Sequence, residues 1–406
     1  MTLLVRTPTS KSMTQRALVL AALADGPCEI YDPLDCDDTR HLRRALQAFG
    51  AEFDTFDHGQ RLIVKPAPLP LVARAGALDC GNAGTALRFA AAFALIADGT
   101  FTLDGDAHMR RRPLGPLTAC LQVMGVEVDY LGTPGCAPVR LRRSACAPLR
   151  ASVDASVSSQ FASALLLVAP LLPDGLELEL TGPIVSRPYL DLTLTMMRAA
   201  GCDAEWTGER ALRVRAGRPR AFVATIETDW SAAAFVLAAG HITGCALVPA
   251  GLVLPRASKQ GDAAIVGWLA ELDRGAINEF DLTDCPDLIA PLAAVALFAK
   301  RPTRIRGAAH TRVKECDRVA VLASELKKLG AVLRVHEDGL DVAPLTEPAH
   351  CGALLDPHDD HRMAMAFGVA SLRIPSLMVT NRHCVSKSFP EFWEVLDEIR
   401  AHAATR

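Results

Sequence analysis

The chain has 406 residues, half of them hydrophobic, and its formal net charge at pH 7 is −3. A chain of this length buries a large core and is expected to form two or more domains. The nearly balanced charge excludes a field that would attract nucleic acid or an anionic membrane surface. The longest apolar runs, such as residues 288–299, are shorter than the roughly 18 residues that cross a bilayer.

Twelve cysteines are scattered along the chain, and no two of them form a C-x-x-C pair. Several stand inside apolar runs such as residues 117–123. We therefore expect buried free thiols in a reducing cytoplasm, and neither a disulfide framework nor a zinc site.

The first predicted helix opens with Ser10, Lys11 and Ser12 and continues through Arg16 into the apolar run 17–23. Hydroxyl groups at a helix start cap the backbone N–H groups, and this end of a helix attracts anions. The same segment imitates a secretory signal, because basic residues precede a short apolar stretch. Since the apolar stretch is at the lower length limit and fits a repeat described below, we expect a cytoplasmic protein.

Residues 79–89 show the clearest pattern for anion binding. Gly81, Asn82 and Gly84 open an otherwise apolar helix, and Arg88 follows one turn later on the same face. Glycine lets the backbone approach a ligand closely, and arginine adds a bidentate donor. An ordinary capped helix with a solvated arginine is the alternative for this segment taken alone.

Similar groups recur at other predicted helix starts or in the turns before them. The segments are 110–113, 157–160, 186–189, 312–318, 360–365 and 385–390. Each one alone fits a capped helix with solvated charges. Together their lysines, arginines, hydroxyls and amides favour a small polyanionic ligand.

Six segments share one plan of an apolar helix, a strand and a second helix. The first helices begin near Ser12, Ala83, Ser159, Ser231, Asp287 and His361. The second helices of four segments end at turns that contain Gly50, Gly125, Gly201 and Gly330, where glycine is the usual stop signal. We infer an α/β fold of two similar halves with three repeats each, joined near residue 228, where residues 221–228 predict a connecting strand. Such symmetry brings the positive helix ends to one cleft.

The motifs SKS-x-x-x-R, GNAGTA-x-R, RRPLG, SSQ, RVKE-x-DR and DHRMAM occur in this order between about residues 7 and 396. They resemble those of the EPSP synthase family, the 3-phosphoshikimate 1-carboxyvinyltransferases of the shikimate pathway. The resemblance implies two domains of three βαβαββ units each, with the active site in the cleft between them. One domain spans residues 11–228 and carries most of the phosphoshikimate site. The other combines residues 1–10 with 229–406 and carries the base and phosphoenolpyruvate groups.

The implied reaction moves the carboxyvinyl group of phosphoenolpyruvate to the 5-hydroxyl of 3-phosphoshikimate and releases phosphate through a tetrahedral intermediate. The resemblance implies no metal or organic cofactor, since the substrate carries its own leaving group. It implies a monomeric cytoplasmic enzyme whose partners are the two substrates, with neither nucleic acid nor membrane among them.

The site residues follow from the resemblance by position. The implied phosphoshikimate site comprises Lys11, Ser12, Arg16, Ser158, Ser159, Gln160, Ser186, Tyr189, Asp287 and Lys314. The implied phosphoenolpyruvate site comprises Lys11, Gly84, Arg88, Arg112, Gln160, Arg318, Arg362 and Lys387. Arginine suits such ligands because its planar fork binds two oxygens and stays charged.

The resemblance also implies the catalytic groups. Asp287 matches the carboxylate that accepts the proton of the 5-hydroxyl, and Glu315 matches the residue that transfers a proton at the methylene carbon. Lys11 is the third implied catalytic residue, and which group moves each proton is left open. Protonation at carbon during attack by an alcohol requires an acid and a base on separate groups. Asp229 and His361 match further cleft positions.

Three positions depart from the family pattern. His310 stands where the family often has an asparagine that contacts phosphoshikimate, and Arg111 replaces a common acidic residue. Phe89 stands where many members have proline.

Two patterns suggest other chemistry. Cys136 resembles the loop cysteine of the UDP-N-acetylglucosamine carboxyvinyltransferases, but it follows a predicted helix instead of preceding one. Residues 358–361 resemble a metal pair without a third ligand at a suitable spacing.

Two alternative functions follow. A UDP-sugar transferase is disfavoured by Lys11-Ser12, residues 158–160 and Lys314-Glu315, which suit a small phosphorylated ring. A protein that binds RNA ends is disfavoured by the acidic balance and by the lack of aromatic and basic strips.

Overall fold

The computed structural model describes residues 2–74, 76–145, 147–346 and 352–405. The chain forms two compact units, one of Thr9–Glu227 and one of Met1–Pro8 with Thr228–Arg406. We call them the N-terminal and the C-terminal unit. Each has its own hydrophobic core, so each buries apolar surface without help from the other.

The N-terminal unit contains three repeats. The first consists of α1 (Lys11–Leu23), β2 (Cys28–Tyr31), α2 (Asp37–Ala48), β3 (Glu52–Phe56), η1 (Asp57–Gly59) and β4 (Arg61–Lys65), and the short β5 (Leu71–Val72) follows it. The second consists of β6 (Ala77–Asp79), α3 (Gly84–Ala92), η2 (Phe93–Leu95), β7 (Ala97–Asp98), β8 (Thr100–Asp104), η3 (Met109–Arg111), α4 (Gly115–Val123), β9 (Val126–Tyr130) and β10 (Val139–Arg143). The third consists of β11 (Arg150–Asp154), α5 (Ser159–Val168), η4 (Ala169–Leu171), β12 (Leu176–Thr181), α6 (Arg187–Ala199), β13 (Ala204–Trp206) and β14 (Ala211–Val214), and β15 (Val223–Thr225) ends the unit.

Each of these repeats has a four-stranded sheet. The strand orders are β15-β2-β4-β3, β6-β8-β10-β9 and β11-β12-β14-β13, with the first pair parallel and the others antiparallel. The connecting strand predicted over residues 221–228 is shorter in the structure, where only Val223–Thr225 form β15. As β15 it pairs with β2, with Val223 opposite Glu29, and completes the first sheet.

The C-terminal unit has the same plan in a reduced form. Its first repeat contains β1 (Leu3–Val5), α7 (Trp230–Thr243), β16 (Leu247–Pro249), η5 (Gly261–Ala264) and α8 (Ile265–Glu271). Its second contains β17 (Asn278–Asp281), η6 (Pro286–Leu288), α9 (Ile289–Ala296), β18 (Thr303–Arg306), η7 (Ala309–Val313), α10 (Arg318–Lys327), β19 (Leu333–His336) and β20 (Gly339–Val342). Its third contains β21 (Leu354–Leu355), α11 (His361–Ala370), β22 (Met378–Val379), η8 (Arg382–Lys387) and α12 (Phe392–Ala404).

In the C-terminal unit, only the middle repeat forms a four-stranded sheet among the described residues, in the order β17-β18-β20-β19. The other two repeats have the parallel pairs β1-β16 and β21-β22. This refines the expectation of three complete units in each half. In the fourth segment the chain passes from α8 to β17 without the expected hairpin, and in the sixth α12 ends the described chain.

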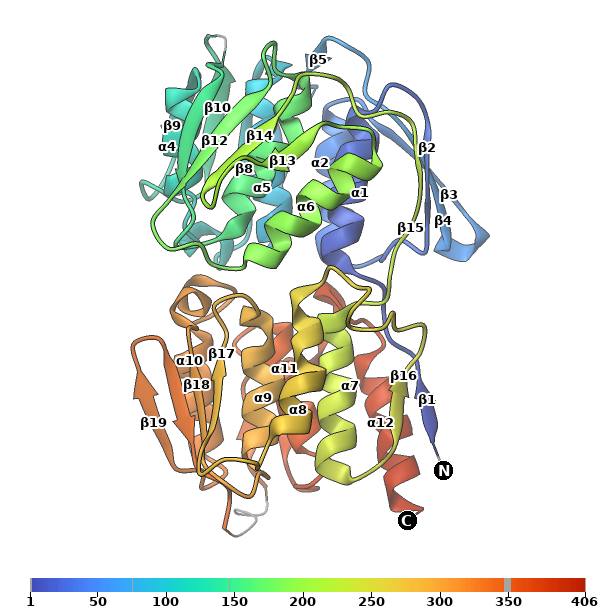
Figure 1. Ribbon diagram of the computed structural model, residues 1–406, viewed down its shortest axis with the longest axis vertical. Coiled ribbons are helices and arrows are strands. Elements are labelled where there is room, and N and C mark those ends of the chain that lie inside the picture. Colours follow the sequence, from blue (N-terminus) through green and yellow to red (C-terminus); the bar gives the residue numbers. More distant parts are fainter. Residues whose placement is uncertain (1, 75, 146, 347–351, 406) are drawn as a thin grey trace. The chain divides into compact units, whose positions relative to one another are not determined.

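The first helices of the repeats form the centre of each unit. In the N-terminal unit α1, α3 and α5 contact one another, and in the C-terminal unit α7, α9 and α11 do so. In Figure 1 the strands of the middle repeat lie on the side of α9 that faces away from α7. These helices are apolar on nearly all faces, which is the composition of a helix surrounded by protein.

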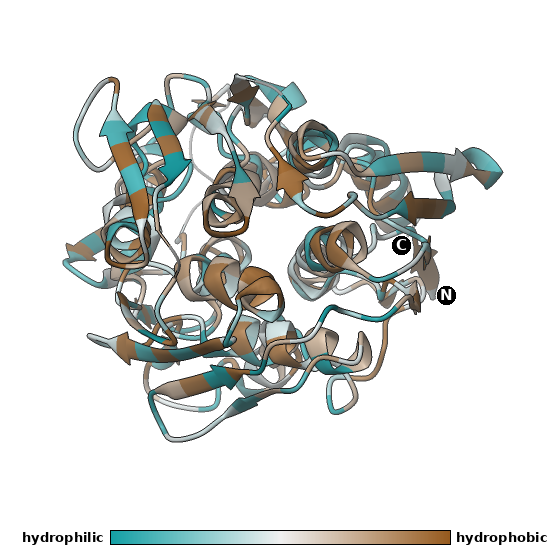
Figure 2. Cartoon of the chain, turned by 90° about the horizontal axis from the view of Figure 1, so that it is seen from above, coloured by the Kyte–Doolittle hydropathy of each residue, from teal (hydrophilic) through white to brown (hydrophobic). Residues whose placement is uncertain are grey.

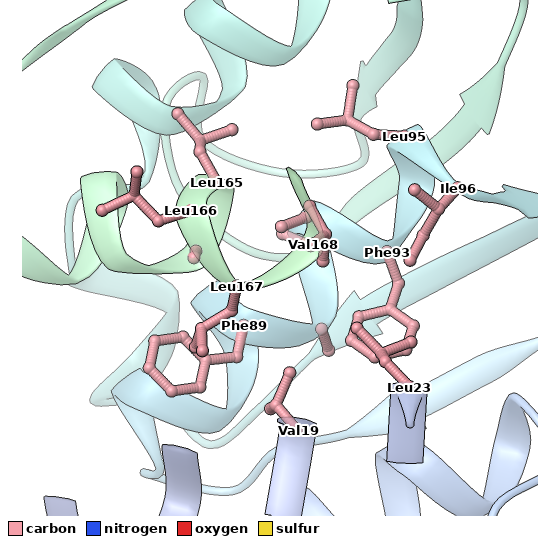
Figure 3. Close-up of a cluster of buried hydrophobic side chains, with 14 of the residues drawn as sticks. Val19, Leu23, Phe89, Phe93, Leu95, Ile96, Leu165, Leu166, Leu167 and Val168 are labelled. Atoms are coloured by element: carbon pink, nitrogen blue, oxygen red, sulfur yellow. The ribbon is translucent and has the colours of Figure 1, made fainter. Parts of the chain in front are cut away.

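Aromatic and branched side chains fill the N-terminal core. Phe89 from α3 and Phe93 from η2 lie near Val19 and Leu23 of α1 and residues 165–168 of α5 (Figure 3). The ring of Phe93 stacks on that of Phe49, with 4.7 Å between centroids. The apolar stretch that imitates a secretory signal thus lies in the core of this unit.

Several strands alternate between hydrophobic and hydrophilic residues, which appears as alternating brown and teal bands in Figure 2. In β10, Val139 and Leu141 are buried while Arg140 and Arg142 are exposed. This period of two is expected of a sheet with one face on the core. Across the described residues, no helix is both long and apolar enough to cross a membrane.

The predicted glycine turns are confirmed. Gly50, Gly125, Gly201 and Gly330 all have positive φ, between 81° and 102°. Ten of the cysteines lie in the described part of the chain, where all are free thiols and seven are buried. Cys146 and Cys351 lie outside the described residues.

Candidate active site

In the N-terminal unit, the start of α1 holds two of the predicted cations. Ser10 caps the helix through the Met13 N–H, and the Lys11 ammonium lies 2.8 Å from a carboxylate oxygen of Asp38. Asp38 stands in the first turn of α2 and is almost fully buried. Asp38 was not among the predicted site residues, although an acidic residue at a helix start is a known signal. The pairing holds the Lys11 side chain in one place.

The Arg16 side chain is buried within the N-terminal unit. Its guanidinium donates to the Thr193 hydroxyl at 2.8 Å, to the Ser12 carbonyl at 2.9 Å and to the Tyr189 carbonyl at 3.1 Å. Burial lowers its pKa to about 10, which leaves it charged at neutral pH. Arg16 therefore joins α1 to α6 and adds positive charge beneath the predicted phosphoshikimate site.

The glycine-rich segment brings Arg88 and Arg112 together around Gly84. Arg88 donates to the Gln160 side-chain oxygen at 2.7 Å and to the Pro113 carbonyl at 2.9 Å. Arg112 donates to the Asn82 carbonyl at 3.2 Å. A Cβ at Gly84 would lie 2.6 Å from the Arg112 guanidinium and 2.7 Å from that of Arg88. The absence of a side chain at Gly84 thus leaves room for both guanidinium groups beside the backbone.

The remaining predicted groups of this unit stand at two further helix starts. Ser158 caps α5 by accepting from the Gln160 N–H at 3.2 Å, and Ser159 is buried beside it. Ser186 precedes α6 in the left-handed region, with φ of 56°. Such a backbone conformation is uncommon for a residue other than glycine and often marks a functional position. Tyr189, in the first turn of α6, is half-buried.

In the C-terminal unit, Asp287 lies at the centre of a buried cluster. Its carboxylate is 2.8 Å from the Arg318 guanidinium, 2.7 Å from that of Arg362 and 3.8 Å from the Lys314 ammonium. Asp287 stands in η6 and Lys314 at the end of η7. Arg318 is the first residue of α10, and Arg362 stands in the first turn of α11. Three helix starts therefore meet at one carboxylate.

Arg318 joins Asp287 to the other predicted acid. It is 1 % exposed and donates to Glu315 at 3.0 Å and to Asp360 at 2.7 Å. The Lys387 ammonium lies 3.8 Å from Glu315. Asp360 also caps α11 through the Arg362 N–H at 2.8 Å. Asp360 was missed as a member of the cluster, although its place before His361 matches an N-cap.

The charges of this cluster shift three pKa values. Burial raises the pKa of Asp287, but Arg362, Lys314 and Arg318 outweigh it, so the net pKa lies well below its ordinary value. Burial lowers the pKa of Lys314, which Asp287 raises only in part. Burial and the nearby Lys314 lower the pKa of His310 to about 3. Asp287 is therefore an ion-paired carboxylate in this structure, and His310 is neutral.

Of the two patterns that suggested other chemistry, Cys136 lies outside the clusters around Gly84 and Asp287, whereas Asp360 of the 358–361 run belongs to the Asp287 cluster through Arg318. Cys136 is half-buried in the loop between β9 and β10, and burial raises the pKa of its thiol. In the described residues, no group of three or more histidine, cysteine, aspartate and glutamate side chains is placed to hold a metal ion. His361, the second histidine of the 358–361 run, is buried at the start of α11.

Comparison with known proteins decides the family. The model of the EPSP synthase family, 3-phosphoshikimate 1-carboxyvinyltransferase, matches residues 2–396. The chain belongs to this family. A 3-phosphoshikimate 1-carboxyvinyltransferase from Thiobacillus denitrificans is 38% identical, with 97% of this chain and 96% of the relative covered. One from Methanoculleus marisnigri is 37% identical, with 96% and 94% covered.

Solved structures support the EPSP synthase fold. An EPSP synthase from Acinetobacter baumannii is similar with a TM-score of 0.76 at 22% identity, covering 98% of this chain and 95% of that one. The enolpyruvyl transferase NikO from Streptomyces tendae is similar with a TM-score of 0.71 at 19% identity, covering 98% and 94%. The chain is thus a transferase of the EPSP synthase family, and the predicted fold class is confirmed.

Proposed function

We propose that the protein transfers the carboxyvinyl group of phosphoenolpyruvate to the 5-hydroxyl of 3-phosphoshikimate and releases inorganic phosphate. Membership of the EPSP synthase family over nearly the whole chain supports this. The observation that carries it is the Asp287 carboxylate held by Arg318, Arg362 and Lys314. A buried base among cations is the arrangement that a reaction between two polyanions requires.

In the proposed mechanism, the substrates rearrange the charges around Asp287. Phosphoenolpyruvate brings a carboxylate and a phosphate, which compete with Asp287 for Arg318 and Arg362. An arginine that pairs with substrate no longer lowers the pKa of Asp287 as strongly, because a nearby opposite charge is what depresses that pKa. Asp287 then becomes basic enough to accept the proton of the 5-hydroxyl. Substrate binding thereby prepares the base.

The second proton transfer is assigned to Glu315. Its carboxylate lies between Arg318 at 3.0 Å and Lys387 at 3.8 Å. As the 5-hydroxyl oxygen bonds to C2 of phosphoenolpyruvate, C3 takes a proton and becomes a methyl group. The tetrahedral intermediate then loses phosphate from C2 and a proton from C3, which restores the carbon–carbon double bond. An acid and base on separate groups serve both steps.

The N-terminal unit is proposed to hold most of the phosphoshikimate. Lys11, Ser12, Ser158, Ser159, Gln160, Ser186 and Tyr189 are the groups assigned to it there, with Arg16 beneath them, and Asp287 and Lys314 are assigned from the other unit. Arg88, Arg112 and Gly84 are assigned to phosphoenolpyruvate together with Arg318, Arg362 and Lys387. The contacts of Arg88 with Gln160 and of Arg112 with Asn82 support the first part of that assignment, because they orient both guanidinium groups beside Gly84. We further propose a monomeric enzyme of the cytoplasm.

A phosphate-release assay tests the proposal. Phosphoenolpyruvate with 3-phosphoshikimate should give phosphate and a product heavier than phosphoshikimate by the carboxyvinyl group. Phosphoenolpyruvate with UDP-N-acetylglucosamine should give none. Release with the UDP-sugar alone would overturn the proposal in favour of the related transferase.

A further inference from the structure

A second buried carboxyl, that of Asp262, lies beside the Asp287 cluster and has no part in the mechanism above. Asp262 stands in η5 and is 2 % exposed. The Ser231 hydroxyl donates a short hydrogen bond to its Oδ2. Within the described residues, its Oδ1 is buried without a hydrogen-bond partner. Burying a carboxylate in such a place costs far more free energy than burying a protonated carboxyl.

The segment that carries Asp262 is hydrogen-bonded to the turn that carries Asp287. The Cys285 thiol, two residues before Asp287, donates to the Gly261 carbonyl at 3.1 Å. The Gln260 side chain accepts from the Trp230 N–H at 3.1 Å at the start of α7. Both η5 and η6 contact α7, and α8 lies beside α7 as well (Figure 1). A change in the charge of Asp262 therefore alters the electrostatic environment of Asp287, and these hydrogen bonds connect the two segments.

Charged groups on several elements act on Asp262. Burial is the largest influence and raises its pKa, and Asp287 in η6 and Asp229 at the cap of α7 raise it further. Arg362 in α11 and the Ser231 hydroxyl lower it. The result is a pKa of about 7. Arg362 thus serves two carboxyl groups, because it also forms the ion pair with Asp287.

We propose that Asp262 is a positioning residue that works in its protonated form, leaving Arg362 available to Asp287 and to the anionic substrate. When Asp262 loses its proton, a second buried negative charge holds Arg362 and repels the incoming anion. Activity should then fall because Asp262 has become charged, and not because the protonation of Asp287 has changed. This inference rests on the proposed function.

The test is a pH profile of kcat/KM for phosphoenolpyruvate between pH 5.5 and 9, with Asp262→Asn and Ser231→Ala. In the native enzyme kcat/KM should fall above about pH 7, through a rise in KM. Asp262→Asn copies the protonated shape, so it should match the native value at pH 6 and lose this fall. Ser231→Ala removes a donor that stabilises the carboxylate, so the fall should move to higher pH. Asp397→Asn, an exposed carboxylate paired with Arg400, is the control with an unchanged profile.

An unchanged alkaline fall of kcat/KM in Asp262→Asn, or a fall moved to lower pH in Ser231→Ala, would overturn the inference.

Thermal unfolding supplies a readout that needs no substrate. Because the unfolded chain releases the Asp262 proton near pH 4 and the folded chain only near pH 7, the contribution of Asp262 to stability falls as the pH rises across this range. Its unfolding temperature should therefore fall relative to Asp262→Asn between pH 4 and 7. A native enzyme without phosphate release would refute the proposed function, while equal unfolding temperature differences at both pH values would refute this inference.

Discussion

Arg318 shows how much a single residue decides in the C-terminal unit. Its guanidinium is 1 % exposed and contacts Asp287, Glu315 and Asp360. Burial lowers its pKa, but these carboxylates raise the net value well above the ordinary one. A buried charge persists only when it is paired in this way. The same pairing places both proposed proton-transfer groups on one cation.

The first prediction at this scale concerns Asp287. Asp287→Ala should lower turnover at least about 100-fold, since a positioned base contributes about 10²–10⁴-fold. Binding of 3-phosphoshikimate should largely survive, as measured by calorimetry, because the surrounding cations remain. Asp397→Ala, which removes an exposed carboxylate, should leave both quantities unchanged. Near-normal turnover in Asp287→Ala would remove Asp287 from the role of base.

The second prediction concerns pH and His310. The unfolded chain binds a proton at this histidine near pH 6.5, whereas burial and Lys314 keep the folded-state pKa at about 3. The contribution of His310 to the free energy of unfolding should therefore fall as the pH drops below about 6.5, by up to about 1.4 kcal/mol per pH unit. In His310→Gln this contribution is absent, so urea unfolding between pH 7 and 4.5 should show a shallower loss. Equal slopes in the two proteins would show that His310 is protonated in the folded state.

At the scale of elements, the starts of helices carry the proposed function. Ser10, Ser158, Asp229, Asp317 and Asp360 each cap a helix through a side chain. A cap satisfies backbone N–H groups and fixes the direction in which the first turn points its side chains. Predicted site residues stand in the first turns of four of these helices, which explains why short polar motifs precede apolar runs along the chain.

The cap of α10 offers a prediction of stability. Asp317 accepts from the Ala320 N–H at 3.0 Å and pairs with Arg312 at 2.8 Å. Asp317→Ala should lower the free energy of unfolding by about 1–2 kcal/mol, because a capping residue is typically worth this much. Asp317→Asn should retain most of the stability, since asparagine caps equally well. Chemical unfolding measures both, and an equal loss in the two variants would assign the effect to the ion pair instead.

At the scale of the whole molecule, the first residues of the chain belong to the C-terminal unit. Strand β1 pairs with β16 in the C-terminal unit, and β15 pairs with β2 in the N-terminal unit. The chain therefore enters and leaves the N-terminal unit at neighbouring points, where Ser10 N–H donates to the Glu227 carbonyl at 2.7 Å. Two connections of this kind restrain two separately folded cores without merging them.

We expect the two units to close when substrate binds. Residues that we assign to the two substrates stand in both units, and exclusion of water strengthens the electrostatic interactions of such a reaction. Small-angle scattering should show a smaller radius of gyration after 3-phosphoshikimate is added. Shikimate without the phosphate group is the matched control and should produce less compaction at equal concentration. An unchanged radius at saturating 3-phosphoshikimate would contradict closure.

Much of this arrangement was predictable from the sequence because it depends on neighbouring residues. Gly50, Gly125, Gly201 and Gly330 mark helix ends through their own backbone preferences, and all four predictions are confirmed. The apolar first helices were likewise recognised from their composition. The reduced sheets of the fourth and sixth repeats were not predicted, since pairing between strands depends on partners far away in the chain.

The sequence by itself determined the family, the six helix starts and the types of charged residue that precede them. Only the tertiary structure decided which charges meet: Lys11 with Asp38, Arg318 with Asp360, and Asp262 near Asp287. The physical reason is that capping and helix termination act within a few residues, whereas burial and ion pairing depend on distances between segments far apart in the chain. The protonation states on which the proposed chemistry depends are set by those distances.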